Sequence, residues 1–446
     1  MKDIGAEEVT EILEYHRKWL DGEKDGARAD MSGTDLTKTR SALAGLDMSY
    51  ANFSGSDMGG MSLSGIDFHG ADFTGTNMRG TTLNEAIFDW ACLRNVDFRD
   101  MEQIHSDFRH ADLRAADFQN ANLSGAALDG ADLSNADLHD SNMRKVYMPS
   151  ANLRNADLTG TSLDGAKMNG ADMCGAKMGK AGLRDADMSK AHMRETDLRE
   201  ADLSGAELYG AVLARADMRK AACEMTCLAW AKMRSANLDG ANLKEANLRG
   251  GDLCGATLRG TDLSGAILDD TNFTGADLTG AEIIDGSLRG AVFKNANLTD
   301  ADLSGTDLFG ADFDGAILTG VKGLEGYSRD AGISDEITDT TGQDAISQAR
   351  KTARELMGNG VIITSAQPGR TYQGKMVAVV GDGRNNNLAV MAISGDRAIL
   401  HDIRETDMNT GLETGARLTL AVDAEGYSSV QDKDETRSRK REGMVR

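Results

Sequence analysis

The sequence is poor in the residues that ordinary globular domains use for rigid turns and large cores. Its 446 residues include 2 prolines and 5 cysteines, and aromatic residues make up only 5% of the chain. An odd number of cysteines without paired spacing does not indicate a disulfide framework. With so few aromatic side chains, a core of this size must be filled by small aliphatic residues.

The chain also lacks the long apolar segments that mark export or membrane insertion. Residues 1–10 contain no apolar run of the signal-peptide type, and no stretch approaches the roughly 20 apolar residues of a membrane-spanning helix. We therefore expect a cytoplasmic protein with no membrane segment. The net charge of −22 argues against direct nucleic-acid binding through neutralised phosphates and favours a basic partner.

Residue sets that carry out catalysis or bind metals are missing from the sequence as well. None of the seven histidines stands at metal-ligand spacing with another histidine or a cysteine. Cys223 and Cys227 are four residues apart but should point in different directions, inward and outward. There is no phosphate-binding loop and no nucleophile motif. We expect no enzymatic activity, no cofactor, and no catalytic, cofactor-binding or metal-binding residues.

What the sequence has in abundance is a pattern of period five. From Leu43 to Leu318, every fifth residue over 56 positions is Leu, Met, Phe, Ile or Cys, with Gln103 as the exception. A small residue precedes each large one by two, Asp or Asn often stands between them, and Gly often follows two residues later. A period of five fits neither a helix nor a strand, so the chain must turn once in every unit. The large residue then points inward, and glycine near the corner permits backbone angles that other residues avoid.

The phenylalanines indicate how many units make one coil. Ten of the 11 Phe residues stand at the large inward site, and each of these ten has another Phe four units away in the sequence. Like rings that stack on one another fill one column of the interior without voids. A repeat of four units predicts four sides per coil, 14 coils from the 56 units and, at about 4.8 Å per coil, a length of about 67 Å.

Runs such as Ala-Asp-Leu-Arg-Ala-Ala-Asp-Phe at 111–118 and Ala-Asp-Leu-Ser-Gly at 301–305 resemble the pentapeptide-repeat family. The resemblance covers positions 41–320, which is more than half of the chain. It implies an all-β solenoid, a right-handed quadrilateral β-helix. Several members of this family, including those of the quinolone-resistance type, protect DNA gyrase by presenting an acidic rod that mimics duplex DNA. The resemblance therefore implies DNA gyrase or topoisomerase as a candidate protein partner, usually met by a homodimer.

Two places break the register of the repeat. Leu36 and Leu43 are seven residues apart, which places a two-residue insertion within 37–40. At 101–105 the length is kept, but Gln103 stands at an inward site, where a buried amide needs hydrogen-bond partners. Either this corner bulges or the Gln side chain turns outward, or the segment forms a recognition bump on the surface.

The N-terminal segment predicts a helix that caps the solenoid. Within 6–20, six residues recur at helical spacing and would form one face of that helix: Val9, Ile12, Leu13, His16, Trp19 and Leu20. Gly22 would end the helix. Because a solenoid exposes unpaired edges at its ends, we expect 1–28 to form a cap on a repeat domain that covers 29–320 and begins near Ala29.

The C-terminal third predicts a separate small domain. Residues 321–342 have the composition of a linker, and 343–430 predict an α+β or β-barrel-like domain that opens with a helix over 343–357. Strands are expected at 361–365, 373–380, 388–393, 398–403 and 417–422, and a basic disordered tail at 431–446. Segments 369–379 and 398–402 resemble KfrB-type domains of plasmid-borne proteins, which implies carriage on a mobile element.

Charge is distributed unevenly along the repeat. Residues 41–140 hold 16 acidic and 5 basic side chains, 141–250 hold 14 and 17, and 251–320 hold 12 and 3. Over the first block this is one net charge per roughly 2.2 Å, close to the 1.7 Å of duplex DNA. The middle block is close to neutral, which favours a macromolecule-binding scaffold with three charge segments. Two alternatives are a DNA mimic that protects gyrase or topoisomerase, and a plasmid-maintenance factor that acts through the C-terminal domain.

Overall fold

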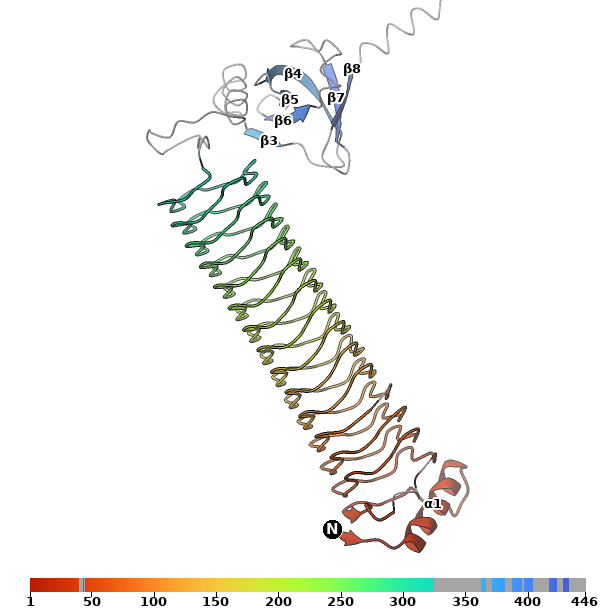
Figure 1. The fold of residues 1–446 in the computed structure, drawn as a ribbon. Coiled ribbons are helices and arrows are strands. Elements are labelled where there is room, and N and C mark those ends of the chain that lie inside the picture. The colour runs from red at the N-terminus through yellow and green to blue at the C-terminus, as the bar shows by residue number, and fades with distance from the viewer. Residues whose placement is uncertain are drawn as a thin grey trace, which may run out of the picture. The chain divides into compact units, whose positions relative to one another are not determined.

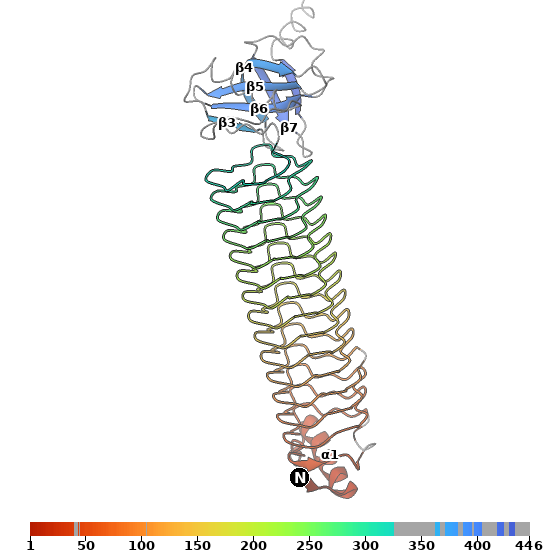
Figure 2. The ribbon, with the colours of Figure 1, turned by 60° about the vertical axis from the view of Figure 1, so that its left-hand side comes forward.

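The computed structural model describes residues 1–39, 43, 45–103 and 105–324, together with six strands of the C-terminal part. The chain divides into two compact units, Met1–Gly323 and Leu324–Arg446. The first unit is a stack of coils with one helix at its N-terminal end (Figure 1 and Figure 2). Among the described residues, no helix combines the length and the apolar character needed to cross a membrane.

In Met1–Gly323, each coil is built from four repeats of five residues, and each such repeat is called a unit below. Residues 20 apart form parallel bridges, from Asp47 with Asp67 through to Asp302 with Lys322. In nearly all units the first and third residues are buried, the second forms the bridges, and the last two make the turn; Leu46, in the first coils, is an exposed exception. The N–H of the large residue donates to the next coil, as Leu203 does to the Ala222 carbonyl at 2.7 Å. These bridges confirm the predicted β-solenoid and its four-unit coil.

The interior consists of columns of like residues. All ten phenylalanines expected to point inward are less than 2% exposed. The Phe88 and Phe108 rings stack with centroids 5.0 Å apart, and those of Phe293 and Phe313 with centroids 4.8 Å apart. Because the rings repeat at the spacing of the coils, each column is filled without a gap.

The corners hold the backbone in the left-handed region whatever the residue. The last residue of every unit from 45 to 320 has φ between 54° and 74°, and 29 of these residues are not glycine. Glycine is therefore only one way to form the corner. A left-handed residue with a side chain costs about 1–2 kcal/mol, and an inter-coil hydrogen bond offsets part of this cost. At Ala115, for example, the N–H donates to the Ser134 carbonyl at 3.1 Å.

Ala115→Gly should raise the free energy of unfolding by up to about 1 kcal/mol, because glycine enters the left-handed region without a Cβ penalty. Ala116→Gly is the matched control. Ala116 is buried outside the left-handed corner, so losing its methyl group should lower stability by about 1 kcal/mol. Chemical denaturation of both variants measures the difference, and equal shifts in the same direction would contradict the role given to corner strain.

Gln103 lies inside the solenoid with both ends of its amide bonded. Its Oε1 accepts a hydrogen bond from the Ser106 N–H at 2.8 Å, and its Nε2 donates to the Ser124 carbonyl at 3.2 Å. The alternative in which this side chain turns outward is therefore wrong, since the residue is fully buried.

The two-residue insertion is confirmed, because Asp35 pairs with Asp57, which is 22 residues away and not the usual 20.

The N-terminal residues lie against the first coil. Helix α1 (Ala6–Leu20) ends before Gly22, whose φ is 73°. On its buried side, the His16 Nδ1 accepts a hydrogen bond from the Ala29 N–H at 3.1 Å. Burial lowers the pKa of His16, which favours the neutral imidazole that this bond requires. Strand β1 (Lys2–Asp3) pairs in parallel with β2 (Thr34–Asp35) and so satisfies part of the edge of the first coil.

The second unit contains one six-stranded sheet. Its strands, in the spatial order β3-β6-β5-β4-β7-β8, are β3 (Ile362–Ser365), β4 (Thr371–Gly381), β5 (Asn387–Ser394), β6 (Arg397–Ile403), β7 (Arg417–Val422) and β8 (Ser428–Asp432). β3 and β6 are parallel, and the other neighbours are antiparallel. The sequence did not predict β8. The expected helix at 343–357, the linker at 321–342 beyond residue 324, and the tail beyond Asp432 lie outside the described residues.

Candidate functional surfaces of the solenoid

Residues whose numbers differ by a multiple of 20 lie on the same one of the four sides of the solenoid, because each coil contains 20 residues. We call one side the aromatic face: it consists of units 46–50, 66–70 and every fourth unit onward to 306–310. We call another the ladder face: it consists of units 56–60, 76–80 and every fourth unit onward to 316–320. Any surface feature of the solenoid can therefore be assigned to a side.

Exposed apolar side chains gather on the aromatic face. Between residues 43 and 323, ten large hydrophobic residues are exposed, and eight of them lie there, where an even spread would place two or three. The eight are Leu46, Tyr50, Ile87, Trp90, Tyr147, Tyr209, Trp230 and Ile267. All five exposed aromatic residues of the described coils are in this set. Contiguous apolar patches are typical of binding surfaces, and these eight side chains share one side of the solenoid, with two or three coils between most of them.

The rings at the corners of this face lie along the solenoid axis, over the next coil. Trp90 stacks on His110 with ring centroids 4.6 Å apart and planes 12° apart. The rings of Tyr50 and Trp230 instead cover glycines: a Cβ added at the glycine one coil further on would lie 2.7 Å from each ring. The sequence thus places either a glycine or another ring under each of these corner aromatics.

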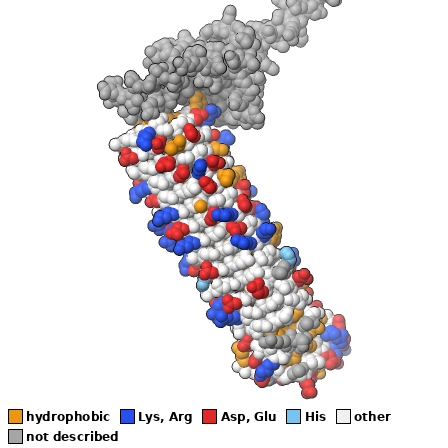
Figure 3. Space-filling model, in the orientation of Figure 1, with side chains coloured by type: hydrophobic (Ala, Val, Ile, Leu, Met, Phe, Trp, Pro, Cys, Tyr) orange, Lys and Arg blue, Asp and Glu red, His pale blue; other side chains and the backbone are white. Residues whose placement is uncertain are grey.

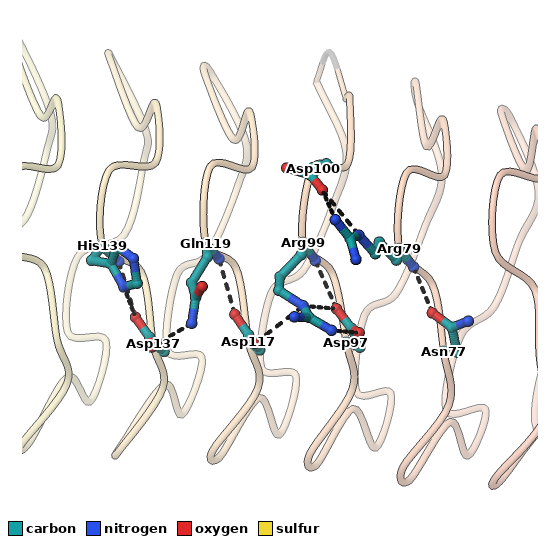
Figure 4. A network of polar contacts seen from close by, with 9 residues as sticks. All are labelled: Asn77, Arg79, Asp97, Arg99, Asp100, Asp117, Gln119, Asp137 and His139. Atoms are coloured by element: carbon teal, nitrogen blue, oxygen red, sulfur yellow. Dashed lines mark hydrogen bonds and ion pairs between the residues drawn. The ribbon is translucent and has the colours of Figure 1, made fainter.

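The ladder face is polar, and many of its charged side chains pair with one another. Figure 4 shows part of it, with side chains of successive coils joined in a row. Arg99 pairs with Asp97 at 2.6 Å (Nη2–Oδ2) and reaches Asp117 at 3.4 Å (Nε–Oδ2). The hydrogen bond from Arg99 lowers the pKa of Asp97, whereas burial raises the pKa of Asp117. One coil further on, the hydrogen bond from His139 to Asp137 raises the pKa of His139. These pairs satisfy part of the charge of the ladder face internally.

Charge also varies along the solenoid, as the sequence counts indicate. Figure 3 shows Lys and Arg side chains gathered over the middle coils among Asp and Glu side chains. Many of these pairs link neighbouring coils, such as Arg154 with Asp172 at 2.9 Å and Lys177 with Asp157 at 3.0 Å. The middle block is close to neutral because it holds 14 acidic and 17 basic side chains, and many of these charges are paired on the surface. Exposed pairs of this kind contribute at most about 1 kcal/mol each to stability.

The cysteines have the orientations predicted for them. Cys223 is fully buried, and burial raises its pKa to about 12, whereas Cys227 is partly exposed. Over the described part of the chain, no group of three or more His, Cys, Asp or Glu side chains is arranged to hold a metal ion. The prediction that the chain has no catalytic or cofactor-binding residues stays a prediction.

The aromatic face was not predicted from the sequence, because charge was followed along the chain and outward residues were not sorted by side. The signal was present, because residue numbers divided by 20 leave 7, 9 or 10 for Tyr147, Tyr209 and Trp230, and all three remainders belong to one side.

These features define a β-solenoid of five-residue repeats with side-chain differences between its faces. Eight copies of the family described as pentapeptide repeats match the sequence between residues 62 and 322, over more than half of the chain, so the chain belongs to the pentapeptide repeat family. No curated protein sequence matches it.

Three solved structures illustrate the similarity. HetL, a pentapeptide repeat protein involved in heterocyst differentiation regulation in the cyanobacterium Nostoc sp. strain PCC 7120, is 31% identical over 48% of this chain and 90% of its own, with a TM-score of 0.21. Full-length QnrB1, a plasmid-mediated fluoroquinolone resistance protein, is 20% identical over 44% and 90%, with a TM-score of 0.26. A pentapeptide repeat protein of the Arabidopsis thaliana thylakoid lumen is 32% identical over 24% and 68%, with a TM-score of 0.12. Similarities of this size carry no information about the partner of the present chain.

Proposed function

We propose that this protein is a non-enzymatic scaffold that binds another protein through the aromatic face of its solenoid. The segregation of exposed apolar side chains on one of four faces supports this proposal. Tyr and Trp are the residues that contribute most to protein interfaces, because they bury a large area at a small entropic cost. A face built from stacked coils presents these rings on a rigid backbone, so little order has to be gained on binding.

Affinity capture from the lysate of the source cells tests the proposal with three full-length baits. The first is the wild-type protein, and the second carries Tyr147→Ser, Tyr209→Ser and Trp230→Ser. The third, matched in number, carries the ladder-face changes Gln119→Ala, His139→Ala and Thr159→Ala. A protein that binds saturably to the first and third baits but not to the second supports the proposal. A captured set that is the same for all three baits contradicts it.

The acidic first block favours a second candidate, a DNA mimic that protects gyrase or topoisomerase. In that block the net charge spacing of roughly 2.2 Å approaches that of duplex DNA. A DNA supercoiling assay separates the two functions, because a mimic should change gyrase activity at micromolar protein and a scaffold for another partner should not.

Further assignments belong to the same proposal and rest on the sequence. They are a cytoplasmic location, a right-handed four-sided coil, a capping role for 1–28, and the division into the repeat domain 29–320, a linker and the C-terminal domain 343–430. The likeness to KfrB-type domains supports a role in plasmid maintenance. A pull-down compares the full chain with a chain that lacks residues 343–446. The role in plasmid maintenance would be abandoned if both chains captured the same plasmid-encoded proteins and the same nucleic acid.

A further inference from the structure

We propose that the N-terminal part of the aromatic face, units 46–50 to 126–130, binds a lysine- or arginine-rich segment of the protein partner. This inference rests on the proposed scaffold function and names the chemistry of the partner. Exposed aromatic rings and carboxylates lie together in this part of the face. A ring attracts a cation through its quadrupole, and a neighbouring carboxylate forms a charge-assisted hydrogen bond with the same group.

Trp90 and Asp89 form the centre of this region. The Trp90 side chain is 62% exposed, and its ring is held in place by stacking on His110. The Asp89 carboxylate faces two imidazoles, His110 Nδ1 at 3.1 Å and His69 Nδ1 at 3.6 Å. Among the described residues, no lysine or arginine lies within ion-pair distance of Asp89, and Arg109, which is held by Asp107, interacts with Asp89 only at longer range. A guanidinium group stacked on Trp90 would therefore meet a carboxylate in the adjacent position of the same corner.

The charged side chains around this centre are mostly acidic. These five units contain five aspartates and a single basic residue, Arg109, which is bound at both Nε and Nη2 by Asp107, at 2.9 Å and 2.6 Å. Asp47, Asp67 and Asp129 form no ion pair with lysine or arginine in the described part of the chain. These carboxylates would speed the association of a basic partner by attraction at long range, and they would form ion pairs with it at contact.

The four sides of the solenoid in a second copy do not offer a basic surface. Acidic and basic residues number 10 and 5 on the aromatic face and 13 and 8 on the ladder face over 41–320. On the remaining two sides they number 11 and 4, and 8 and 8. Averaged over 41–320, no side of the solenoid carries net positive charge, so the solenoid of a second copy offers no basic side to these acidic units.

The same face contains its own control. Trp230 stands at the equivalent corner, is 53% exposed and covers Gly250. Its surroundings differ, because the units of this face from 146 to 250 hold three basic residues, Lys167, Lys190 and Arg249, against two acidic ones. If a cationic segment binds as proposed, replacing Trp90 should weaken its binding, and replacing Trp230 should not.

Calorimetric titration of the full-length protein with a deca-arginine peptide tests this inference, and deca-glutamate serves as the charge-reversed probe. Trp90→Ala and Asp89→Asn should each weaken deca-arginine binding by about tenfold, whereas Trp230→Ala should change it less than about twofold. Binding should weaken as salt rises, and deca-glutamate should not bind. Alanine is tolerated at such corners, as Ala115 shows, and Asp89→Asn keeps the shape of the side chain.

Three results would overturn the inference: no binding of deca-arginine, equal losses at Trp90 and Trp230, or binding of both peptides. The scaffold function would survive any of them if a captured protein still depended on Tyr209 and Trp230. If the captured protein no longer depended on Tyr209 and Trp230 while deca-arginine still bound at Trp90, the scaffold function would be contradicted and the cation-binding site would stand.

Discussion

Leu203→Asp should destabilise the solenoid by about 3–5 kcal/mol, because it places an unpaired carboxylate inside a dry column. Leu203 is fully buried, and the residues one coil before and after it in the same column, Leu183 and Cys223, are fully buried as well. No cation can reach the new charge without opening the coil. Chemical denaturation followed by circular dichroism measures the loss, and hydrogen exchange of the neighbouring coils locates it.

Ala222→Asp provides the matched control for this change. It adds the same carboxylate one coil further on, at the bridge position, where Asp202 and Asn242 stand in the adjacent coils. Ala222 is partly exposed, like Asp202 and Asn242, so the shift should stay within about 0.5 kcal/mol. An unchanged denaturation midpoint for Leu203→Asp, or equal losses for both variants, would contradict the inward register.

Gly26→Ala should separate α1 from the chain that follows it. A Cβ at this position would overlap the backbone of Trp19 and Lys18, which cannot move aside as the end of a side chain can. The strain should cost about 1–3 kcal/mol. Because the Ala27 N–H donates to the Tyr15 carbonyl at 3.0 Å in the same crossing, the helix should lose its attachment. Faster hydrogen exchange of the α1 amides would report this.

Gly5→Ala is the control for the crossing at Gly26. Gly5 precedes α1 with φ of −76°, and a Cβ there would meet no heavy atom within 4 Å. Its effect should stay below about 1 kcal/mol. Coils far from α1 should keep their exchange rates in both variants, because each coil contacts only its neighbours. Uniform acceleration throughout the solenoid would show that α1 supports more than the first coil.

The parts of this fold that follow a strict period could be predicted from the sequence. Inward residues such as Leu203 recur at every fifth position and the Phe pairs at every fourth unit, so the register and the number of sides follow from packing alone. Gln103 could not be placed in this way. Its position depends on whether Ser106 and Ser124 offer hydrogen-bond partners, and that depends on three-dimensional geometry.

The surface was harder to predict for a physical reason. An outward residue satisfies no packing rule, so no five-residue pattern marks Trp90 and Trp230, and their shared side follows only once the 20-residue coil is applied to their numbers. The corner residues show the same limit. A left-handed φ at Trp90 could not be inferred from its residue type, because it is imposed by the coil and not by the side chain.

The core repeats with every unit, whereas the position of a side chain around the axis repeats only with every coil. A deletion of one unit would leave every large residue inside, yet it would turn all later residues by a quarter of a revolution. Removing residues 151–155, for instance, would put Trp90 and Trp230 on different sides of an intact solenoid. Adding or removing one whole coil would keep them aligned and alter only their separation. The five-residue pattern thus sets the stability of the core, whereas the number of units between two residues sets whether they lie on the same side. The binding surface can therefore be changed by adding or removing whole units.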